Sequence, residues 1–442
     1  MTNIAILGAG MAGFGAAHRF YQKKIRSTIF EQHGYYGGHA TTFSFKGGYT
    51  YDDGPHISFT KNERLQKLFA QNVDNQYEQI QAKVNNFWKG HWIKHPVQCN
   101  LFGIPSDLVT IILLEIIKLQ NETNETNETN EILINTYQNW LEKTFGKTFS
   151  HTFPIEYGKK FHTTTADNMS TEWLSPRLYK PSLEEVIQGA LSPSTSDVHY
   201  VNHFRYPTHG GFISYLQSFP SETSLKLNTR LIELDPKQKL LRFHNGSVKE
   251  YDHIVSSIPL TVLIPMIKDT PDDVLTAAQK LACTQCVIVN IAIDRTDISD
   301  AHWTYFYDDD YIFSRLSFPH MFSANNVPAK TGSIQAEIYF SEKYKPRNIS
   351  IDQCILTTIN DLKRCQLVKD SDHILFQNGW ESSFAQVIFD LDRADNLEIV
   401  HGYLNDLQIE YCGRYGNWEY IWTDEAFISG EEAAQRILER IL

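Results

Sequence analysis

The first candidate for chemistry in this chain is a glycine loop that follows a short apolar run. The run over 3–8 leads into Gly8 and Gly10, and Gly13 completes a G-x-G-x-x-G pattern. A second apolar run, over 27–30, ends at Glu31. Where a strand turns into a helix, such glycines let backbone approach a pyrophosphate, the helix N-terminus faces the phosphates, and the acidic residue binds a ribose hydroxyl. The sequence therefore predicts a dinucleotide site; the alternative is a βαβ unit whose glycines only permit packing.

A second glycine-rich segment, beyond Glu31, indicates which dinucleotide is bound. It reads Gly37-Gly38-His39-Ala40, and Asp53-Gly54-Pro55-His56 comes next. The adenosine half of a dinucleotide ends at the acidic residue, so a glycine pair beyond it predicts backbone close to a longer cofactor. This arrangement resembles the extended fingerprint of the FAD-dependent amine-oxidase-like superfamily, which implies FAD.

The elements that position these residues come from three separated blocks of sequence. A strand-rich stretch over 225–259 contains an Asn245-Gly246 hairpin turn, and a glycine turn followed by a helix closes the chain. We predict an α/β fold, with a Rossmann-like FAD-binding domain (a parallel sheet with an added β-meander) and a mixed α+β substrate cap domain inserted in sequence. The FAD-binding domain would comprise 1–85, 213–285 and 395–442, and the cap 86–212 and 286–394. Within the cap, the polar repeat over 120–131 predicts a flexible surface loop.

Composition limits the class of protein and its partners. The chain has 442 residues, 42% of them hydrophobic and 21% charged, which is typical of a globular protein of two or three domains. Its net charge of −12 argues against a nucleic-acid partner. The N-terminus carries the glycine loop rather than a basic leader, and the apolar run over 108–119 is interrupted by charges and too short to span a bilayer. Scattered cysteines suit a reducing compartment; Cys283-x-x-Cys286 could be a redox or metal pair, but it has no second pair, so we expect two structural thiols and no metal site. We therefore expect a cytoplasmic protein without a membrane span; the oligomeric state stays open.

The combined motifs resemble the protoporphyrinogen-oxidase-like amine oxidoreductases, and within them the branch around UDP-galactopyranose mutase. They include the glycine loop, the glycine pair, 53–56, Ser256–Pro259, Phe313–Arg315 and Gly413-Arg414. The resemblance implies an active site beside the flavin, under the cap. The catalytic candidates that it implies are His56, Arg315, Arg414 and Tyr420. The implied cofactor-binding residues are Gly8, Gly10, Met11, Ala12, Gly13, Glu31, Gln32, Gly37, Gly38, His39, Ala40, Asp53, Gly54, Pro55, His56, Leu231, Gly413, Arg414 and Asp424.

Three of the four catalytic candidates have a competing structural interpretation. In the mutases a histidine lies against the flavin and arginines bind the diphosphate, and an arginine fork suits two phosphate oxygens. His56 could instead be a histidine satisfied by backbone in a turn. Arg315 could form a surface ion pair with the run of aspartates over 308–310, and Tyr420 could pack in an aromatic cluster between Trp418 and Trp422.

The chain also departs from the mutases, and this leaves several functions open. Phe161 or His162 stands where the mutases stack uracil on a tryptophan, and Phe212 stands where they carry a tyrosine. The first hypothesis is a FAD-dependent enzyme, mutase-like or redox, acting on a nucleotide sugar or glycan intermediate in surface-polysaccharide or glycoconjugate synthesis. The second is a flavin amine or alcohol oxidoreductase with a small-molecule substrate, and the third is a non-catalytic FAD-binding protein. A shared surface of Arg315, Arg414, Tyr420 and Tyr403 would favour an anionic substrate.

Overall fold

A five-stranded parallel sheet carries the N-terminal glycine loop. The computed structural model describes residues 2–125, 135–175, 177–196, 198 and 201–441 of the chain. The strands follow the order β19-β13-β1-β2-β9, and every neighbouring pair is parallel. They come from distant parts of the sequence: β1 (Ile4–Leu7), β2 (Ser27–Phe30), β9 (Ser224–Lys226), β13 (His253–Ser256) and β19 (Glu410–Tyr411).

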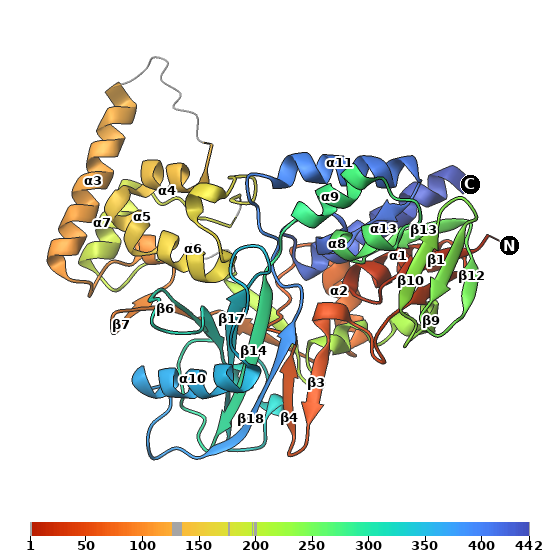
Figure 1. Cartoon of the computed structure of the whole chain (residues 1–442). Helices are drawn as coiled ribbons and strands as arrows, with labels where there is room; N and C mark the ends of the chain where they lie inside the picture. The colour runs from red at the N-terminus through yellow and green to blue at the C-terminus, as the bar shows by residue number, and fades with distance from the viewer. Residues whose placement is uncertain (1, 126–134, 176, 197, 199–200, 442) are drawn as a thin grey trace.

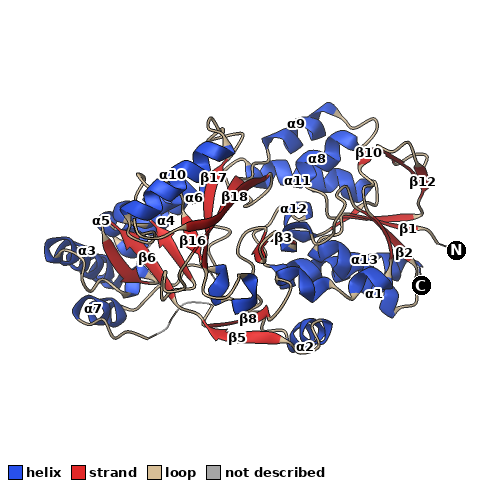
Figure 2. Cartoon of the chain, turned by 90° about the horizontal axis from the view of Figure 1, so that it is seen from below, coloured by secondary structure: helices blue, strands red, loops and turns tan. Residues whose placement is uncertain are grey.

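The two faces of β1 pack into different layers, because successive side chains of a strand point to opposite sides. Ile4 and Ile6 join a core that includes residues of helices α1 (Met11–Gln22) and α13 (Thr423–Ile441). Ala5 and Leu7 join another core together with residues of β10 (Leu231–Asp235) and β11 (Leu240–Phe243). These two strands form an antiparallel meander with the exposed β12 (Val248–Glu250). Figure 2 shows α1 and α13 on one side of the sheet and the meander on the other. This is the predicted Rossmann-like arrangement with an added β-meander.

Glycines bring α1 and α13 into direct backbone contact. A Cβ on Gly15 would lie 2.0 Å from the carbonyl oxygen of Phe427, so any larger residue would push the two helices apart. A Cβ on Gly13 would lie 2.0 Å from the carbonyl oxygen of Gly8. Gly13 therefore seats the start of α1 against the loop that follows β1, which is the packing role expected of the third glycine of the motif.

A seven-stranded mixed sheet lies beside the parallel sheet (Figure 1). Its order is β18-β14-β17-β16-β15-β6-β7, with only the β15–β6 pair parallel. Helix α10 (Ile351–Arg364) packs on β14 and β18, and α6 (Pro154–His162) contacts β17. The strands are β6 (Val84–Trp88), β7 (His91–Lys94), β14 (Gln285–Ile293), β15 (Trp303–Phe306), β16 (Arg315–Ser317), β17 (Gly332–Phe340) and β18 (Ile374–Ser382).

Short hairpins and helices connect and cover the two sheets. The antiparallel strand pairs are β3 (Thr42–Phe45) with β4 (Tyr49–Asp52), and β5 (Tyr77–Gln81) with β8 (His203–Pro207). The other α-helices are α2 (Glu63–Asn72), α3 (Ser106–Glu125), α4 (Tyr137–Phe145), α5 (Lys147–Thr152), α7 (Leu183–Leu191), α8 (Leu260–Leu263), α9 (Asp272–Lys280), α11 (Arg393–Asp406) and α12 (Gly413–Gly416).

The polar repeat expected as a loop over 120–131 is helical in its first part. Helix α3 continues to Glu125, because the polar residues after Leu119 extend an established helix without a proline or glycine to end it. Residues 126–131 lie outside the described residues. The domain boundaries stay a prediction, although the strands of the parallel sheet all fall within 1–85, 213–285 and 395–442.

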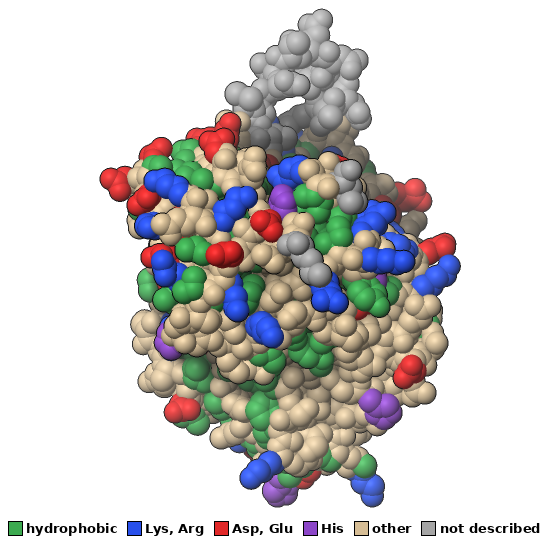
Figure 3. All heavy atoms as spheres, turned by 90° about the vertical axis from the view of Figure 1, so that its right-hand side faces the viewer, with side chains coloured by type: hydrophobic (Ala, Val, Ile, Leu, Met, Phe, Trp, Pro, Cys, Tyr) green, Lys and Arg blue, Asp and Glu red, His purple; other side chains and the backbone are tan. Residues whose placement is uncertain are grey.

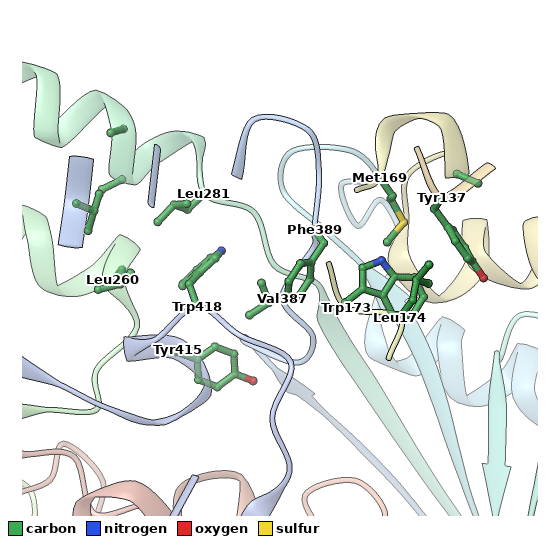
Figure 4. Packing of buried hydrophobic residues seen from close by; sticks show 14 of the residues in the cluster. Tyr137, Met169, Trp173, Leu174, Leu260, Leu281, Val387, Phe389, Tyr415 and Trp418 are labelled. Carbon is green, nitrogen blue, oxygen red and sulfur yellow. The ribbon is translucent and has the colours of Figure 1, made fainter. Parts of the chain in front are cut away.

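One hydrophobic core links the regions of the two sheets. It runs from Leu260 and Leu281, past Trp418 and Phe389, to Trp173 and the helices around it (Figure 4). On the face shown in Figure 3, acidic and basic side chains are interspersed among other residues. None of the helices in the described part of the chain combines the length and apolar character needed to cross a bilayer.

Candidate functional site

A cavity of about 520 Å³ begins at the loops that follow β1 and β2 and extends to β18. All of the predicted cofactor-binding residues line it except Gly13, Gly54, Pro55 and Asp424. Gly54 and Pro55 line a neighbouring cavity, and Gly13 has the packing position described above. Asp424 lies in the first turn of α13, between Thr423, which lines the cavity, and Glu425, which accepts a hydrogen bond from the Trp422 backbone.

The glycine loop fits a pyrophosphate. Gly8 has a φ of +98°, which favours glycine, and Gly37 donates its N–H to the Ala9 carbonyl at 2.8 Å. No side chain among the described residues caps the N-terminus of α1, where Gly10, Met11 and Ala12 line the cavity. The first backbone N–H groups of a helix lack partners within it and attract anions. This end of the cavity therefore offers what the two phosphates of FAD require.

Glu31 is held in place by the backbone on both sides of it. Its side chain is buried, Oε2 accepts from the Ala9 N–H at 2.9 Å, and Oε1 accepts from the His33 N–H at 2.9 Å. The carboxylate thereby ties the end of β2 to the glycine loop, and its remaining lone pairs can accept from a ribose hydroxyl.

The opposite end of the cavity is polar and centred on Asp53. Trp380 donates from Nε1 to Asp53 Oδ1 at 2.7 Å, and His39 donates from Nδ1 to Oδ2 at 3.0 Å. Ser382 also donates to Oδ2, at 3.3 Å. Burial alone would raise the pKa of Asp53, but the hydrogen bond and charge of His39 and the hydrogen bond from Trp380 lower it below its usual range. Asp53 therefore stays ionised and fixes His39 beside the place where the cavity meets its neighbour.

A second cavity, of about 170 Å³, brings together all four catalytic candidates. It shares His39, Asp53, His56, Arg414 and Trp422 with the first cavity, so the two are continuous. One face of the seven-stranded sheet supplies a row of residues that pair across five strands and line the two cavities: Tyr305, Arg315, Glu337, Ile288 and Trp380. The sheet therefore places side chains that are distant in sequence on one wall.

The position of His56 is compatible with both interpretations that the sequence left open. Its ring is held in a turn, with Nδ1 donating to the Gly54 carbonyl at 2.9 Å, and it also lines both cavities. Burial lowers the pKa of His56 to about 4, and the charge of Arg414 acts in the same direction. The imidazole is therefore neutral near neutral pH, and because Nδ1 carries the proton, Nε2 is a hydrogen-bond acceptor.

Arg315 pairs with Glu337, and not with the aspartates over 308–310. Their strands place the two residues opposite each other, and Arg315 donates from Nη2 to Glu337 Oε1 at 2.8 Å and from Nε to Oε2. Tyr339 also donates to Oε1, at 2.9 Å. The side chains of Arg315 and Glu337 are 22% and 6% exposed. Sequence proximity suggested the aspartates, but strand register decides the partner, and Asp310 pairs with Arg364 instead.

We expect replacement of Arg315 by leucine to lower the free energy of unfolding by about 3–5 kcal/mol, because it leaves the buried Glu337 carboxylate without its cation. The double substitution Arg315→Leu with Glu337→Leu should recover most of that loss. Urea unfolding of the wild type, the single variant and the double variant checks this. Equal losses in the single and double variants would show that Glu337 does not need Arg315.

Arg414 is held by neutral oxygens. It donates from Nη2 and Nε to the Ile421 carbonyl at 2.7 and 3.1 Å, and from Nη1 to the Ala385 carbonyl at 2.9 Å and to Gln386 Oε1 at 3.1 Å. Among these acceptors there is no carboxylate, so the positive charge of Arg414 remains available to a ligand. Its guanidinium lies 5.5 Å from the centre of the Tyr420 ring, which also lines the second cavity.

Some residues that the sequence analysis named lie outside the two cavities. Tyr403 is in α11, donates to Thr270 Oγ1 at 3.4 Å and lines neither cavity. Phe161 and Phe212 are buried, and the Phe212 ring centre is 5.5 Å from that of His56. Tyr420 lines the second cavity and also packs against the large core that contains the buried Trp418, so both interpretations of this residue stay open.

Sequence reasoning missed the contribution of the mixed sheet and the buried hydrogen bonds of Asp52. Trp380, Ser382 and Glu337 have no local motif around them. Asp52 is buried and accepts from Tyr206 at 2.8 Å, Thr42 at 2.6 Å and the Phe212 N–H at 3.0 Å. Burial raises the pKa of Asp52 to about 6. Its position beside the predicted Asp53 was the only signal in the sequence.

We expect acid to destabilise the protein below about pH 6.5 partly through His162. Burial lowers the pKa of His162 from its ordinary 6.5 to about 3, so between these values the unfolded chain binds a proton that the native chain does not. The free energy of unfolding then falls as the pH falls, by about 1.4 kcal/mol per unit for this group. Asp52 acts oppositely between its ordinary 3.8 and about 6, because its native form holds the proton. Thermal unfolding at several pH values should show a shallower acid loss in His162→Phe than in the wild type, and equal slopes would contradict the assignment.

No group of three or more histidine, cysteine, aspartate or glutamate side chains arranged to hold a metal ion occurs within the described residues. The six cysteines are free thiols.

Comparison with known proteins gives a consistent result. The chain is 23% identical over 403 residues to a 15-cis-phytoene desaturase, chloroplastic/chromoplastic, from Glycine max. The alignment covers 82% of this chain and 65% of the desaturase, so the chain spans less than two thirds of that relative's length.

Among solved structures, the fold is similar to that of reduced UDP-galactopyranose mutase, with a TM-score of 0.92 and 24% identity over 100% of this chain and 94% of that one. It is also similar to an assigned protoporphyrinogen oxidase from Exiguobacterium sp. 255-15, with a TM-score of 0.74 and 14% identity over 99% of each chain. At these identities the likeness establishes the fold.

The profile of the family described as Flavin containing amine oxidoreductase matches residues 11–438, nearly the whole chain. The resemblance and the FAD cofactor predicted from the sequence are thus confirmed, as is the fold class. The chain belongs to the flavin containing amine oxidoreductase family, and it is a FAD-dependent enzyme of that superfamily.

Proposed function

We propose that this enzyme acts on a nucleotide sugar or a related glycan intermediate, in a mutase-like or redox reaction that serves surface-polysaccharide or glycoconjugate synthesis. The observation that carries the proposal is the second cavity, which joins the first at His56 and Arg414. Bound FAD supplies the redox or nucleophilic chemistry at such a junction. We also propose that the enzyme is located in the cytoplasm, because its six free cysteines suit that compartment.

The charges and rings of the second cavity suit an anionic substrate with a planar or ring-shaped part. Arg414 is anchored by carbonyl and amide oxygens, so these contacts do not neutralise its charge. Arg315 meets Glu337 through Nε and Nη2, which leaves Nη1 outside the pair. Aromatic rings of Trp303, Tyr305 and Tyr339 line the same space. A diphosphate beside Arg414 and a sugar or base against the rings would use both features.

The solved structures of similar fold support the same substrate class only through their names. The structure with a TM-score of 0.92 is that of a UDP-galactopyranose mutase. The departures at Phe161, His162 and Phe212 argue for a nucleotide sugar that differs from the UDP-galactose of the name. The chain's own residues would bind the diphosphate, orient the sugar toward His56 and exclude water from the junction.

The test is a panel of nucleotide sugars incubated with the enzyme before and after reduction of its flavin. A mutase-like reaction should produce isomer over many turnovers only with the reduced enzyme and without stoichiometric reductant. A net redox reaction should bleach the oxidised flavin and then require an acceptor. The proposal is wrong if no nucleotide sugar binds at millimolar concentration in either state.

A second candidate is a flavin oxidoreductase with an amine or another small substrate. Aromatic rings of Trp303, Tyr305 and Tyr339 line the second cavity, and a cationic amine could bind against their faces. The Glycine max relative is a desaturase by name, which also points to a redox reaction. Rapid bleaching of the flavin by an amine or alcohol, with no nucleotide sugar bound, would support this candidate.

A further inference from the structure

The segment 418–422 forms part of the wall of both cavities without regular secondary structure. It lies between α12 and α13, Tyr420 lines the second cavity, and Trp422 lines both. Its backbone must therefore be fixed by contacts with other elements. Three arginines donate to its carbonyl groups: Arg393 to Trp418, Arg177 to Tyr420, and Arg414 to Ile421.

Arg177 differs from the other two because its guanidinium lies over both rings that face the cavities, Tyr420 and Trp422. Its guanidinium carbon lies 4.1 Å from the centre of the Tyr420 ring and 4.2 Å from that of Trp422. A planar guanidinium stacks on aromatic faces more favourably than an ammonium does. The Tyr420 ring thus has Arg177 at 4.1 Å and Arg414 at 5.5 Å.

Arg177 reaches this segment from a distant part of the chain. It follows Trp173, whose ring packs in the large core and lies 6.4 Å from the Tyr420 ring. Figure 4 shows Trp173 beside Phe389 and Val387, in the row of core residues that continues to Trp418. The loop that carries Arg177 is therefore anchored in the core, and it can hold the aromatic pair in one position.

We propose that Arg177 is a positioning residue that fixes two rings of the site: Tyr420, which lines the second cavity, and Trp422, which lines both the cofactor cavity and the second cavity. It acts through these two rings, because it lines neither cavity itself. Without the planar guanidinium of Arg177, the rings of Tyr420 and Trp422 can rotate, and the cofactor cavity loses its fixed wall at Trp422. The proposal concerns the geometry of the site and holds for either substrate class.

The test compares Arg177→Leu and Arg177→Lys with a matched control, Arg364→Leu, in the purified holoenzyme. Arg364 stacks on Tyr311 at 3.8 Å and pairs with Asp310, away from both cavities. We expect both Arg177 variants to release FAD about fivefold faster or more on dilution and to change the visible circular dichroism of the flavin. The lysine variant keeps the charge and the fold but not the stacking plane, so it should behave like the leucine variant. Arg364→Leu should leave both readouts unchanged.

A double-substitution cycle with Trp422→Leu separates positioning from general stability. If Arg177 acts through Trp422, removing Arg177 should have little further effect on FAD release once Trp422 is gone. Fully additive effects would overturn the proposal. So would Arg177 variants that lower the melting temperature but leave FAD release and the flavin spectrum as in the wild type, or a control variant with the same spectral change.

Discussion

Replacement of Gly10 by valine should give a folded protein that binds no flavin. Gly10 has a φ of −87° and a ψ of −172°, which valine adopts readily. A Cβ there would meet its nearest protein atoms, in Gly37 and Gly38, at 3.8 Å, an ordinary contact. The Cβ therefore meets no close protein atom, and we expect the rest of the side chain to project where Gly10 lines the cavity, in the path of the pyrophosphate. The measurement is the visible absorption of the purified protein, which should fall from a stoichiometric flavin spectrum to the baseline.

A control glycine separates loss of cofactor from loss of fold. Gly402 lies in α11, where a Cβ would meet none of the described atoms within 4 Å, so Gly402→Val should keep both the fold and the flavin. Gly13→Ala is a contrasting variant, because its Cβ would collide with the Gly8 carbonyl and damage the fold itself. If Gly10→Val retains a full flavin spectrum, the glycine loop is not the cofactor site.

The cofactor end of the site could be predicted because its information is local. Three glycines, the strand before them and the acidic residue after them are close in sequence, and the βαβ geometry fixes how they meet. The structure places Gly8, Gly10 and Glu31 around one cavity, and Gly13 in the packing position expected of it. The meander was also readable, because Asn245-Gly246 between two alternating runs is a strong hairpin signal, and Gly246 has a φ of +80°.

The mixed sheet's contribution could not be predicted, because it depends on register between distant strands. Glu337 meets Arg315 across β16 and β17, and Trp380 joins the same row through Ile288 of β14. A shift of one residue in any of these pairings would turn the side chains to the other face. From the sequence alone, the only partners suggested for Arg315 were the nearby aspartates over 308–310. Strand register instead pairs Arg315 with Glu337.

The partners of Arg177 and Asp53 could not be predicted either, because they come from elements that are distant in the sequence. Arg177 reaches Tyr420 and Trp422 only because the large core brings residue 173 close to the C-terminal block. Asp53 was predicted as part of a turn, but its partner Trp380 comes from the far edge strand of the other sheet. The two ends of the site therefore differ: a local motif defines the phosphate end, and tertiary pairing defines the junction where the two cavities meet.

The second large effect is expected from His56→Ala, which should retain FAD and lose most catalysis. The neutral imidazole presents Nε2 as an acceptor at the junction of the two cavities, while Nδ1 is committed to the Gly54 carbonyl. A positioned group that accepts or returns a proton contributes about 10²–10⁴-fold to a rate, so kcat should fall by that factor once a substrate is identified. Because the pKa of His56 is lowered to about 4, activity that needs its neutral form should persist below pH 6.5 and fall only near pH 4.

The matched control for this effect is His401→Ala. His401 makes the same kind of contact, with Nε2 donating to the Gly416 carbonyl at 3.0 Å, and burial lowers its pKa too, but it lines neither cavity. Rates and flavin content measured for both variants distinguish a histidine at the reaction site from one that serves a turn. If His56→Ala keeps the wild-type kcat, or if His401→Ala loses as much, the junction of the cavities is not where the proton is handled, and the catalytic role must be sought among the remaining groups of the second cavity, Arg414 and Tyr420 first.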